Sequence, residues 1–194
     1  EGSAKFILSF LRNPYCRDAV HELLQARDGL MLGICNGFQA LVKLGLVPFG
    51  RILDTDESCP TLTFNAIGRH QSRLVTTRVA SNKSPWLMGY AVGQTHTVAI
   101  SHGEGRFVAS PELLCRLANN GQIATQYVDL AGKPSMDIRF NPNASVQAIE
   151  GICSPDGRVL GKMAHSERMG KGLYQNVPGD KEQNIFENAA RYFR

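Results

Sequence analysis

The sequence predicts a single α/β domain, and three observations lead to this class. Leu30–Ile34 is a short apolar run typical of a strand buried on both faces, and apolar residues at helical spacing follow it directly. Other strand-like and helix-like segments succeed one another along the chain. The length of 194 residues, with 43% hydrophobic and 20% charged residues, suffices for one domain with a sizeable core.

Amphipathic patterns predict helices before the first strand and at the end of the chain. Ala4–Leu11 has helical spacing and is stopped by Asn13-Pro14, because the residue before a proline avoids the helical region. Asp180, with Gln183 three residues later, has the chemistry of a capped helix start. The predicted helices cover residues 4–11, 15–26, the stretch after Cys35, 84–88, 111–119 and 180–194, and residues 47–60 are predicted to be a loop.

Runs of apolar and β-branched residues predict the strands. They cover residues 30–34, 61–65, 71–80, 95–101, 107–109, 122–128, 146–153 and 159–163. The last two flank Ser154-Pro-Asp-Gly157, which predicts a hairpin. In a doubly wound sheet the strand at 30–34 is normally central. We therefore expect either that its neighbours all come later in the chain or that the front of the domain is missing.

Composition and charge exclude several classes of protein. The net charge of +4 is mild and the basic residues are scattered, so we expect no nucleic-acid partner. The five cysteines are widely spaced without a C-x-x-C pair, which favours a reducing cytoplasm and offers no zinc-type metal site. No apolar run approaches membrane-spanning length and no signal peptide opens the chain, so we expect a cytoplasmic protein without a membrane partner.

Cys35 lies where the buried strand turns sharply into a helix, and Gly33 and Gly37 flank it. This is the pattern of a nucleophile elbow with cysteine in place of serine. Small neighbours are expected because the two backbones approach closely around the exposed side chain. N–H groups at the helix start can stabilise a thiolate and then an oxyanion. A cysteine at such a junction can also be a small core residue, but the glycines and Gln39 favour a nucleophile.

Two further stretches carry ionisable side chains. His165 follows the predicted hairpin, and in an extended segment Glu167 would point to the same side and orient the imidazole. A surface ion pair has the same pattern, so this pair gains meaning from the cysteine upstream. In the other stretch, two glycines alternate with His102, Glu104 and Arg106, which is typical either of a polar turn or of a site.

Four motifs occur in order along the chain. They are Gly33-Ile-Cys35-Asn-Gly37-Phe-Gln39, His102-Gly-Glu-Gly-Arg106, Asn141-Pro-Asn143, and Asp156-Gly-Arg-Val159 leading to His165-Ser-Glu167-Arg168. Together they resemble the glutaminase domain of phosphoribosylformylglycinamidine synthase, and the likeness covers nearly the whole chain. The first motif by itself indicates only a class I glutamine amidotransferase. The second and fourth motifs narrow the likeness to this synthase.

The resemblance implies roles for individual residues. Cys35 would be the nucleophile that attacks the glutamine carboxamide, and His165 would take its proton and later protonate the departing ammonia. Glu167 would orient His165. The backbone N–H of Asn36 would contribute to the oxyanion hole, and Gln39 would help to hold the substrate.

The resemblance also implies a fold and partners. Residues 1–194 would form one flavodoxin-like, three-layer α/β/α glutamine amidotransferase domain that lacks its N-terminal strands. Its ammonia would pass to a synthase domain, in the same polypeptide or on a partner subunit, where ATP and Mg would activate formylglycinamide ribonucleotide (FGAR) for conversion to the amidine (FGAM). This chain would need no cofactor. His102, Glu104 and Arg106 would line the glutamine pocket or contact the synthase domain.

Two departures from the family pattern matter. Ser166 stands where most relatives carry proline, which loses backbone stiffness but keeps both catalytic side chains, as in certain single-polypeptide bacterial forms. The family also has first strands and a glycine-rich loop before the helix that begins this chain, and that loop supplies the other half of the oxyanion hole. Since losing one oxyanion donor costs about a hundredfold to a thousandfold in rate, we expect weak glutaminase activity from the 194 residues alone.

Two other functions compete with glutamine hydrolysis. A cysteine peptidase or deglycase of related fold would share the elbow, but in those proteins a histidine usually follows the cysteine, and here that residue is Asn36. A non-catalytic docking domain could keep the triad residues without turnover. Trapping glutamine on Cys35 as a thioester would separate this last alternative from an enzyme.

Overall fold

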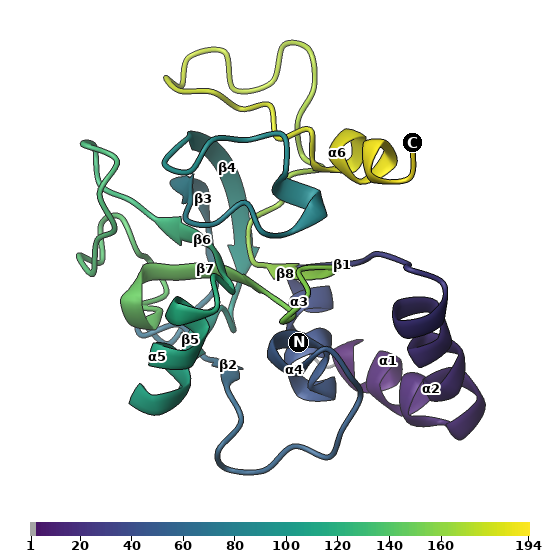
Figure 1. The fold of residues 1–194 in the computed structure, drawn as a ribbon. Coiled ribbons are helices and arrows are strands. Elements are labelled where there is room, and N and C mark those ends of the chain that lie inside the picture. Colours follow the sequence, from purple (N-terminus) through teal and green to yellow (C-terminus); the bar gives the residue numbers. More distant parts are fainter. Residues whose placement is uncertain (1–2) are drawn as a thin grey trace.

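A curled six-stranded sheet forms the centre of the computed structural model, which describes residues 3–194 (Figure 1). Glu1 and Gly2, the first residues of the predicted domain, lie outside the described residues. In spatial order the strands are β1 (Met31–Ile34), β8 (Val159–Lys162), β7 (Ile149–Cys153), β6 (Ile123–Tyr127), β3 (Gln71–Val79) and β4 (Thr95–His102). A separate antiparallel pair joins β2 (Thr61–Thr63) to β5 (Arg106–Val108).

Helices cover both faces of the sheet, which gives the three-layer α/β/α arrangement. One face packs against α3 (Asn36–Leu44) and α5 (Pro111–Asn119), and the other packs against α6 (Ile185–Tyr192) and the short 3-10 helix η2 (Pro85–Leu87) (Figure 1). The remaining helical segments are α1 (Ser3–Arg12), α2 (Pro14–His21), the π-helix η1 (Glu22–Ala26), α4 (Leu46–Phe49) and the 3-10 turn η3 (Val146–Ala148).

The middle strands are buried on both faces, because successive side chains of a strand point to opposite sides. The first cluster of buried residues, which includes Phe38 of α3, contains Ile123, Ile152 and Val159. The next residue along each of these strands belongs instead to the second cluster, with Trp86 and Ile185: they are Ala124, Cys153 and Leu160. This two-sided burial explains why these strands are nearly continuous apolar runs in the sequence.

The strand that leads to Cys35 lies at the edge of the sheet and not at its centre. β1 pairs in parallel with β8, with Met31 opposite Val159 and Ile34 opposite Lys162. Within residues 3–194 no strand pairs with the other edge of β1, and all the other neighbouring pairs of this sheet are antiparallel. Within the described residues, β1 therefore does not occupy the central position that a doubly wound sheet would give it. Its described neighbour, β8, comes later in the chain.

The predicted hairpin is present as β7 and β8, but two other predicted elements differ. One helical turn, α4, occupies the start of the 47–60 loop, between Gly45 and Gly50, which both have positive φ. The last helix begins at Ile185, and Asp180 is not its N-cap. The carbonyl of Asp180 instead accepts a hydrogen bond from the Thr97 amide at 2.6 Å, so pairing with β4 overrides the local capping pattern.

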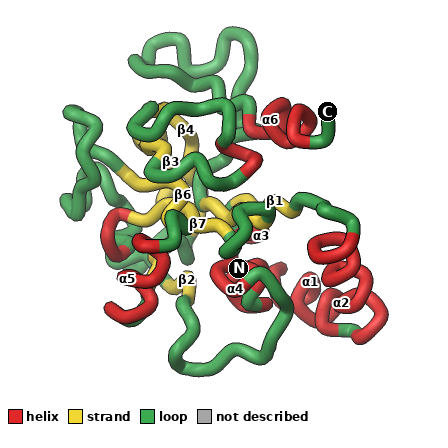
Figure 2. Tube along the Cα trace, viewed as in Figure 1, coloured by secondary structure: helices red, strands yellow, loops and turns green. Residues whose placement is uncertain are grey.

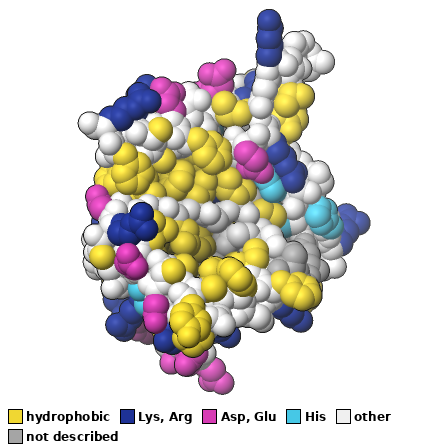
Figure 3. Space-filling view, turned by 90° about the vertical axis from the view of Figure 1, so that its right-hand side faces the viewer, with side chains coloured by type: hydrophobic (Ala, Val, Ile, Leu, Met, Phe, Trp, Pro, Cys, Tyr) yellow, Lys and Arg dark blue, Asp and Glu magenta, His cyan; other side chains and the backbone are white. Residues whose placement is uncertain are grey.

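Long connections surround the sheet at residues 50–60, 128–145 and 163–184 (Figure 2). Hydrophobic side chains form a broad band on the face that carries α1, α2 and α6 (Figure 3). On α1, Phe6 and Phe10 are 84% and 66% exposed. No helix among residues 3–194 is long and apolar enough to cross a lipid bilayer.

Candidate active site

The sharp turn predicted at Cys35 is present. The residue joins β1 to α3 with φ 53° and ψ −108°, a conformation that is strained for any residue except glycine. Its N–H donates to the carbonyl of Lys162 at 2.8 Å, and its own carbonyl accepts from the Gln39 amide at 3.1 Å. The end of β8 and the first turn of α3 therefore hold the bend, with the thiol half-buried.

The two flanking glycines have different reasons to be small. A Cβ on Gly33 would lie 2.5 Å from Leu41 Cδ1 and 2.7 Å from the Gly37 backbone, so strand and helix touch at this point. A Cβ on Gly37 would meet nothing within 4 Å. The expected crowding is confirmed at Gly33 and is wrong for Gly37, whose backbone is the surface that Gly33 contacts.

Strand β4 brings two segments together: the elbow at Cys35, and residues 163–168 around His165, called here the histidine segment. Cys35 Sγ donates to the carbonyl of Ser101 at 3.5 Å, and the His165 amide donates to the carbonyl of Ala99 at 2.8 Å. These acceptors are two residues apart on one strand, a separation of roughly 7 Å. His165 also lies only three residues after Lys162, the last residue of β8. The carbonyl of Lys162 accepts the hydrogen bond from the Cys35 amide.

His165 and Glu167 form the predicted pair. The distance from His165 Nδ1 to Glu167 Oε1 is 2.5 Å, and the His165 side chain is 9% exposed against 43% for Glu167. Since Nδ1 is engaged by the carboxylate, the other ring nitrogen carries the lone pair of the neutral imidazole. His165 Nε2 is buried and has no hydrogen-bond partner within residues 3–194. The arrangement is that of a general base with an orienting acid.

Asn36 is the first residue of α3, directly after Cys35, the predicted nucleophile. Its backbone N–H therefore lies at the positive end of the helix dipole, where negative charge is stabilised. This is the position that the elbow pattern assigns to an oxyanion-hole donor.

A buried asparagine holds both ends of the His102–Gly105 segment. Asn65 Nδ2 donates to the His102 carbonyl at 2.8 Å, and Asn65 Oδ1 accepts from the Gly105 amide at 3.1 Å. The same oxygen lies 3.1 Å from His102 Nδ1. A Cβ on Gly105 would lie 2.2 Å from the His102 ring, so only glycine lets the backbone fold over the imidazole. The stretch is therefore a hydrogen-bonded loop, and its part in a site stays a prediction.

The Asn141-Pro-Asn143 stretch anchors this loop to the sheet. Asn143 Nδ2 donates to the Gly105 carbonyl and to Tyr127 Oη, the latter at 3.1 Å. Ser145 Oγ also donates to the Gly105 carbonyl, at 3.2 Å. Tyr127 is fully buried, and desolvation raises its pKa well above the ordinary value, with nearby Glu150 and Cys35 adding to the effect. Tyr127 thus lies between the loop, through Asn143, and the region of the Cys35 thiol.

Gln39 joins the elbow helix to the same loop. Its side chain is 2% exposed, and its Nε2 donates to the Glu104 carbonyl at 2.6 Å. Arg106 Nε is buried without a hydrogen-bond partner among the described residues. The structure therefore brings Gln39 together with the loop of His102, Glu104 and Arg106, and contact of these side chains with a substrate stays a prediction.

The sequence analysis missed two sets of residues around this region. Asn65 lies in a predicted strand that carries no motif, so nothing in the pattern marks it. Lys162 and Glu150 are both fully buried beneath the His165 segment. A lysine inside the apolar run Val159–Met163 was the available signal, because charged side chains are almost never buried without a partner.

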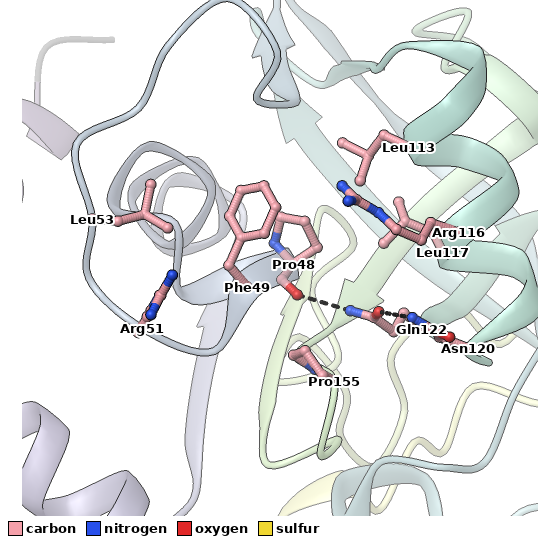
Figure 4. A pocket seen from close by; sticks show the side chains of 10 residues that line it. All are labelled: Pro48, Phe49, Arg51, Leu53, Leu113, Arg116, Leu117, Asn120, Gln122 and Pro155. Atoms are coloured by element: carbon pink, nitrogen blue, oxygen red, sulfur yellow. Dashed lines mark hydrogen bonds between the residues drawn. The ribbon is translucent and has the colours of Figure 1, made fainter.

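A pocket of about 350 Å³ lies elsewhere, between α4, α5 and the turn that precedes β8 (Figure 4). Its buried Gln122 donates to the carbonyl of Pro48 at 2.9 Å. Pro155 of that turn is at the opposite end of β8 from the elbow, because β8 runs parallel to β1. None of the predicted site residues lines this pocket. Residues 3–194 contain no cluster of three or more His, Cys, Asp or Glu side chains able to hold a metal.

The fold and the elbow together define an α/β/α domain built around a cysteine nucleophile motif. The chain belongs to the CobB/CobQ-like glutamine amidotransferase domain family, whose profile matches residues 1–193. It is 37% identical over 168 residues to phosphoribosylformylglycinamidine synthase subunit PurQ of Synechococcus sp. (strain JA-2-3B'a(2-13)), covering 87% of this chain and 64% of that protein. The subunit of the same name in Chlorobaculum tepidum is 37% identical over 176 residues, covering 91% and 68%.

A solved structure shares the fold. The structure of PurLQS from Thermotoga maritima superposes with a TM-score of 0.63 at 24% identity, covering 90% of this chain and 68% of that chain. The flavodoxin-like class implied by the sequence motifs is therefore confirmed. The chain spans about two thirds of the length of the two PurQ relatives, and 54% of the subunit of the same name in Synechococcus sp. (strain JA-3-3Ab).

Proposed function

We propose that this chain hydrolyses glutamine through a Cys35–His165–Glu167 triad and supplies the ammonia to phosphoribosylformylglycinamidine synthase. The observation that carries the proposal is the meeting of the strained elbow and the histidine segment on β4, through the carbonyls of Ser101 and Ala99. The relatives named as PurQ subunits supply the particular reaction.

In the first half of the reaction, His165 Nε2 takes the thiol proton of Cys35, and the thiolate attacks the carboxamide carbon of glutamine. The resulting tetrahedral oxyanion accepts a hydrogen bond from the Asn36 backbone N–H. Glu167 keeps the proton of His165 on Nδ1 and stabilises the imidazolium, as the 2.5 Å contact allows. His165 then protonates the departing nitrogen, ammonia leaves, and a thioester remains on Cys35.

In the second half, water attacks the thioester carbonyl while His165 accepts one of its protons. Collapse of the second tetrahedral intermediate breaks the C–S bond and returns the proton to sulfur. Glutamate leaves and the free thiol is restored. All of this chemistry uses side chains of this chain, so it requires no cofactor here.

We assign the substrate contacts to side chains that lie beside the elbow. Gln39, His102, Glu104 and Arg106 belong to one ordered loop-and-helix unit beside the elbow. We propose that this unit holds the α-amino and α-carboxylate groups of glutamine or faces the synthase. ATP and Mg would bind on the synthase portion, in the same polypeptide or a partner subunit, where ammonia converts FGAR to FGAM.

The test is to label the chain with a diazo-ketone analogue of glutamine and to measure its intact mass. We expect one adduct, located at Cys35 and suppressed by excess glutamine, because the analogue and glutamine would compete for the proposed triad. Cys153 is the internal control, since burial raises its pKa to about 12. Labelling that ignores glutamine, or that spreads over several cysteines, would contradict the proposal and favour a non-catalytic docking domain.

A peptidase or deglycase would share the elbow, but Asn36 occupies the position after Cys35, where those proteins usually carry a histidine. We expect the 194-residue chain alone to hydrolyse glutamine slowly. A glutaminase assay on this chain measures the rate, and full activity would contradict the expectation.

A further inference from the structure

A buried ion pair lies beneath the histidine segment. Lys162 Nζ is 3.8 Å from Glu150 Oε1, and both side chains are fully buried. Burial lowers the pKa of Lys162, and the Glu150 carboxylate opposes that shift. Placing two charges in a core is costly, and apolar replacements of such pairs are often neutral or stabilising. A pair kept in this place therefore calls for a reason other than stability.

The two charges hold the residue before His165 from both sides. Lys162 Nζ donates to the Ala164 carbonyl at 2.9 Å, and Glu150 Oε1 accepts from the Ala164 amide at 2.6 Å. The His165 amide is fixed in turn by the carbonyl of Ala99. The peptide group that joins Ala164 to His165 is thus held at its oxygen and at its nitrogen.

The same ammonium holds the residue after His165. Lys162 Nζ donates to Ser166 Oγ at 2.8 Å, and Ser166 Oγ donates to Gln183 Oε1 at 2.6 Å. Gln183 Oε1 also accepts from Lys162 Nζ at 3.1 Å. With the Ala164 carbonyl, these contacts use all three N–H donors of the ammonium. The residues on either side of His165, Ala164 and Ser166, are consequently both hydrogen-bonded to the buried ammonium of Lys162.

We propose that the Lys162–Glu150 pair, acting through Ala164 and Ser166, is the device that positions the His165 imidazole for Cys35. This inference rests on the proposed function. Lys162, Glu150 and Ser166 are positioning residues, because they reach the reaction only through the backbone around His165. The segment forms no helix or strand, and apart from the β-bridge between His165 and Ala99 its geometry comes from these contacts.

The test compares four proteins by the rate at which iodoacetamide alkylates Cys35, measured from pH 5 to pH 9 by peptide mass. The double variant Lys162→Met/Glu150→Gln removes both charges together and leaves neither unpaired. Ser166→Ala removes the hydrogen bond between Lys162 and the residue after His165, and it keeps the Lys162–Glu150 ion pair. Thr125→Val is the matched control, since Thr125 Oγ1 donates to the other carboxylate oxygen of Glu150 without contacting the histidine segment.

In the wild-type protein we expect alkylation to begin below the pKa of a free thiol, about 8.5, because the imidazole takes the proton. The double variant should move the midpoint toward that value and slow alkylation at pH 6.5 at least tenfold. Ser166→Ala should slow it about threefold. Thr125→Val should stay within twofold of wild type, whatever its melting temperature.

A double variant with the wild-type midpoint and rate would overturn the inference, as would a Thr125→Val rate that falls equally far. Should the double variant not fold, Ser166→Ala decides: a rate equal to wild type overturns the inference and a threefold loss supports it. Failure of the proposed function has another signature, namely a wild-type thiol with a low midpoint that neither hydrolyses glutamine nor is protected by it.

Discussion

Cys35 and His165 are both held against β4, but by different means. The elbow is built from residues close in sequence: Gly33 touches the Gly37 backbone, and Cys35 itself takes the strained φ of 53°. The histidine segment has no regular structure and depends on buried polar contacts from β7, β8 and the approach to α6. Steric constraints between neighbouring residues thus shape the turn at Cys35, whereas tertiary hydrogen bonds fix the backbone around His165.

The largest expected effect comes from removing the Cys35 thiol, the proposed nucleophile. Cys35→Ala should lower the rate of glutamine hydrolysis by about 10⁴-fold or more, as loss of a triad nucleophile does elsewhere. Glu167→Gln should cost less, about tenfold to a hundredfold in kcat, because Glu167 is 43% exposed and water can partly replace it. Steady-state kinetics in the presence of the synthase measure both losses. If Cys35→Ala and Glu167→Gln lowered the rate equally, the elbow and the histidine segment would not differ in the way described above.

A smaller effect tests whether close approach of the backbones is the reason for a glycine at the elbow. Gly33→Ala should destabilise the protein by about 1–3 kcal/mol, because the new Cβ would meet the Gly37 backbone and cannot be accommodated by a side-chain rotation. Gly37→Ala is the matched control and should be neutral or stabilising, by up to about 1 kcal/mol, since it lies in open space within a helix. Urea unfolding measures both. Similar losses at the two glycines would show that close approach is not the cause.

The smallest effect concerns the cysteine on β7, the strand that also carries Glu150. Burial raises the pKa of Cys153 to about 12 in the folded protein, above its value near 9.0 in the unfolded chain. The unfolded state therefore loses a proton first, and stability falls as pH rises from 9 toward 12. Between pH 8 and pH 10 the wild type should lose about 1 kcal/mol more than Cys153→Ala. Parallel pH curves from urea unfolding would contradict this.

Prediction from the sequence succeeded where a pattern reflects local geometry. The elbow, the hairpin of β7 and β8, and the pairing of His165 with Glu167 were all predicted, because each depends on residues within a few positions of one another. The start of the last helix was predicted wrongly, whereas the described neighbour of β1 comes later in the chain, which is one of the two alternatives that the sequence left open. Strand order and the contact of Asp180 with Thr97 both join segments far apart in the chain.

Missed residues follow the same division. Asn65 bridges His102 and Gly105, which lie about forty positions away, and no local motif marks it. Lys162 contacts Gln183, 21 positions away, and Glu150 on the neighbouring strand β7. An isolated charge in an apolar strand signals a buried partner, but its identity depends on which strands become neighbours.

By itself, the sequence determined the α/β class, the cysteine elbow and the family. These rest on excluded volume and backbone dihedral preferences, which act between neighbouring residues and leave a readable pattern. Only the tertiary structure decided what holds His165 and the His102–Arg106 loop. Buried amide, carboxylate and ammonium groups must find partners wherever the fold supplies them, and here those partners come from strands and loops that are distant in the chain.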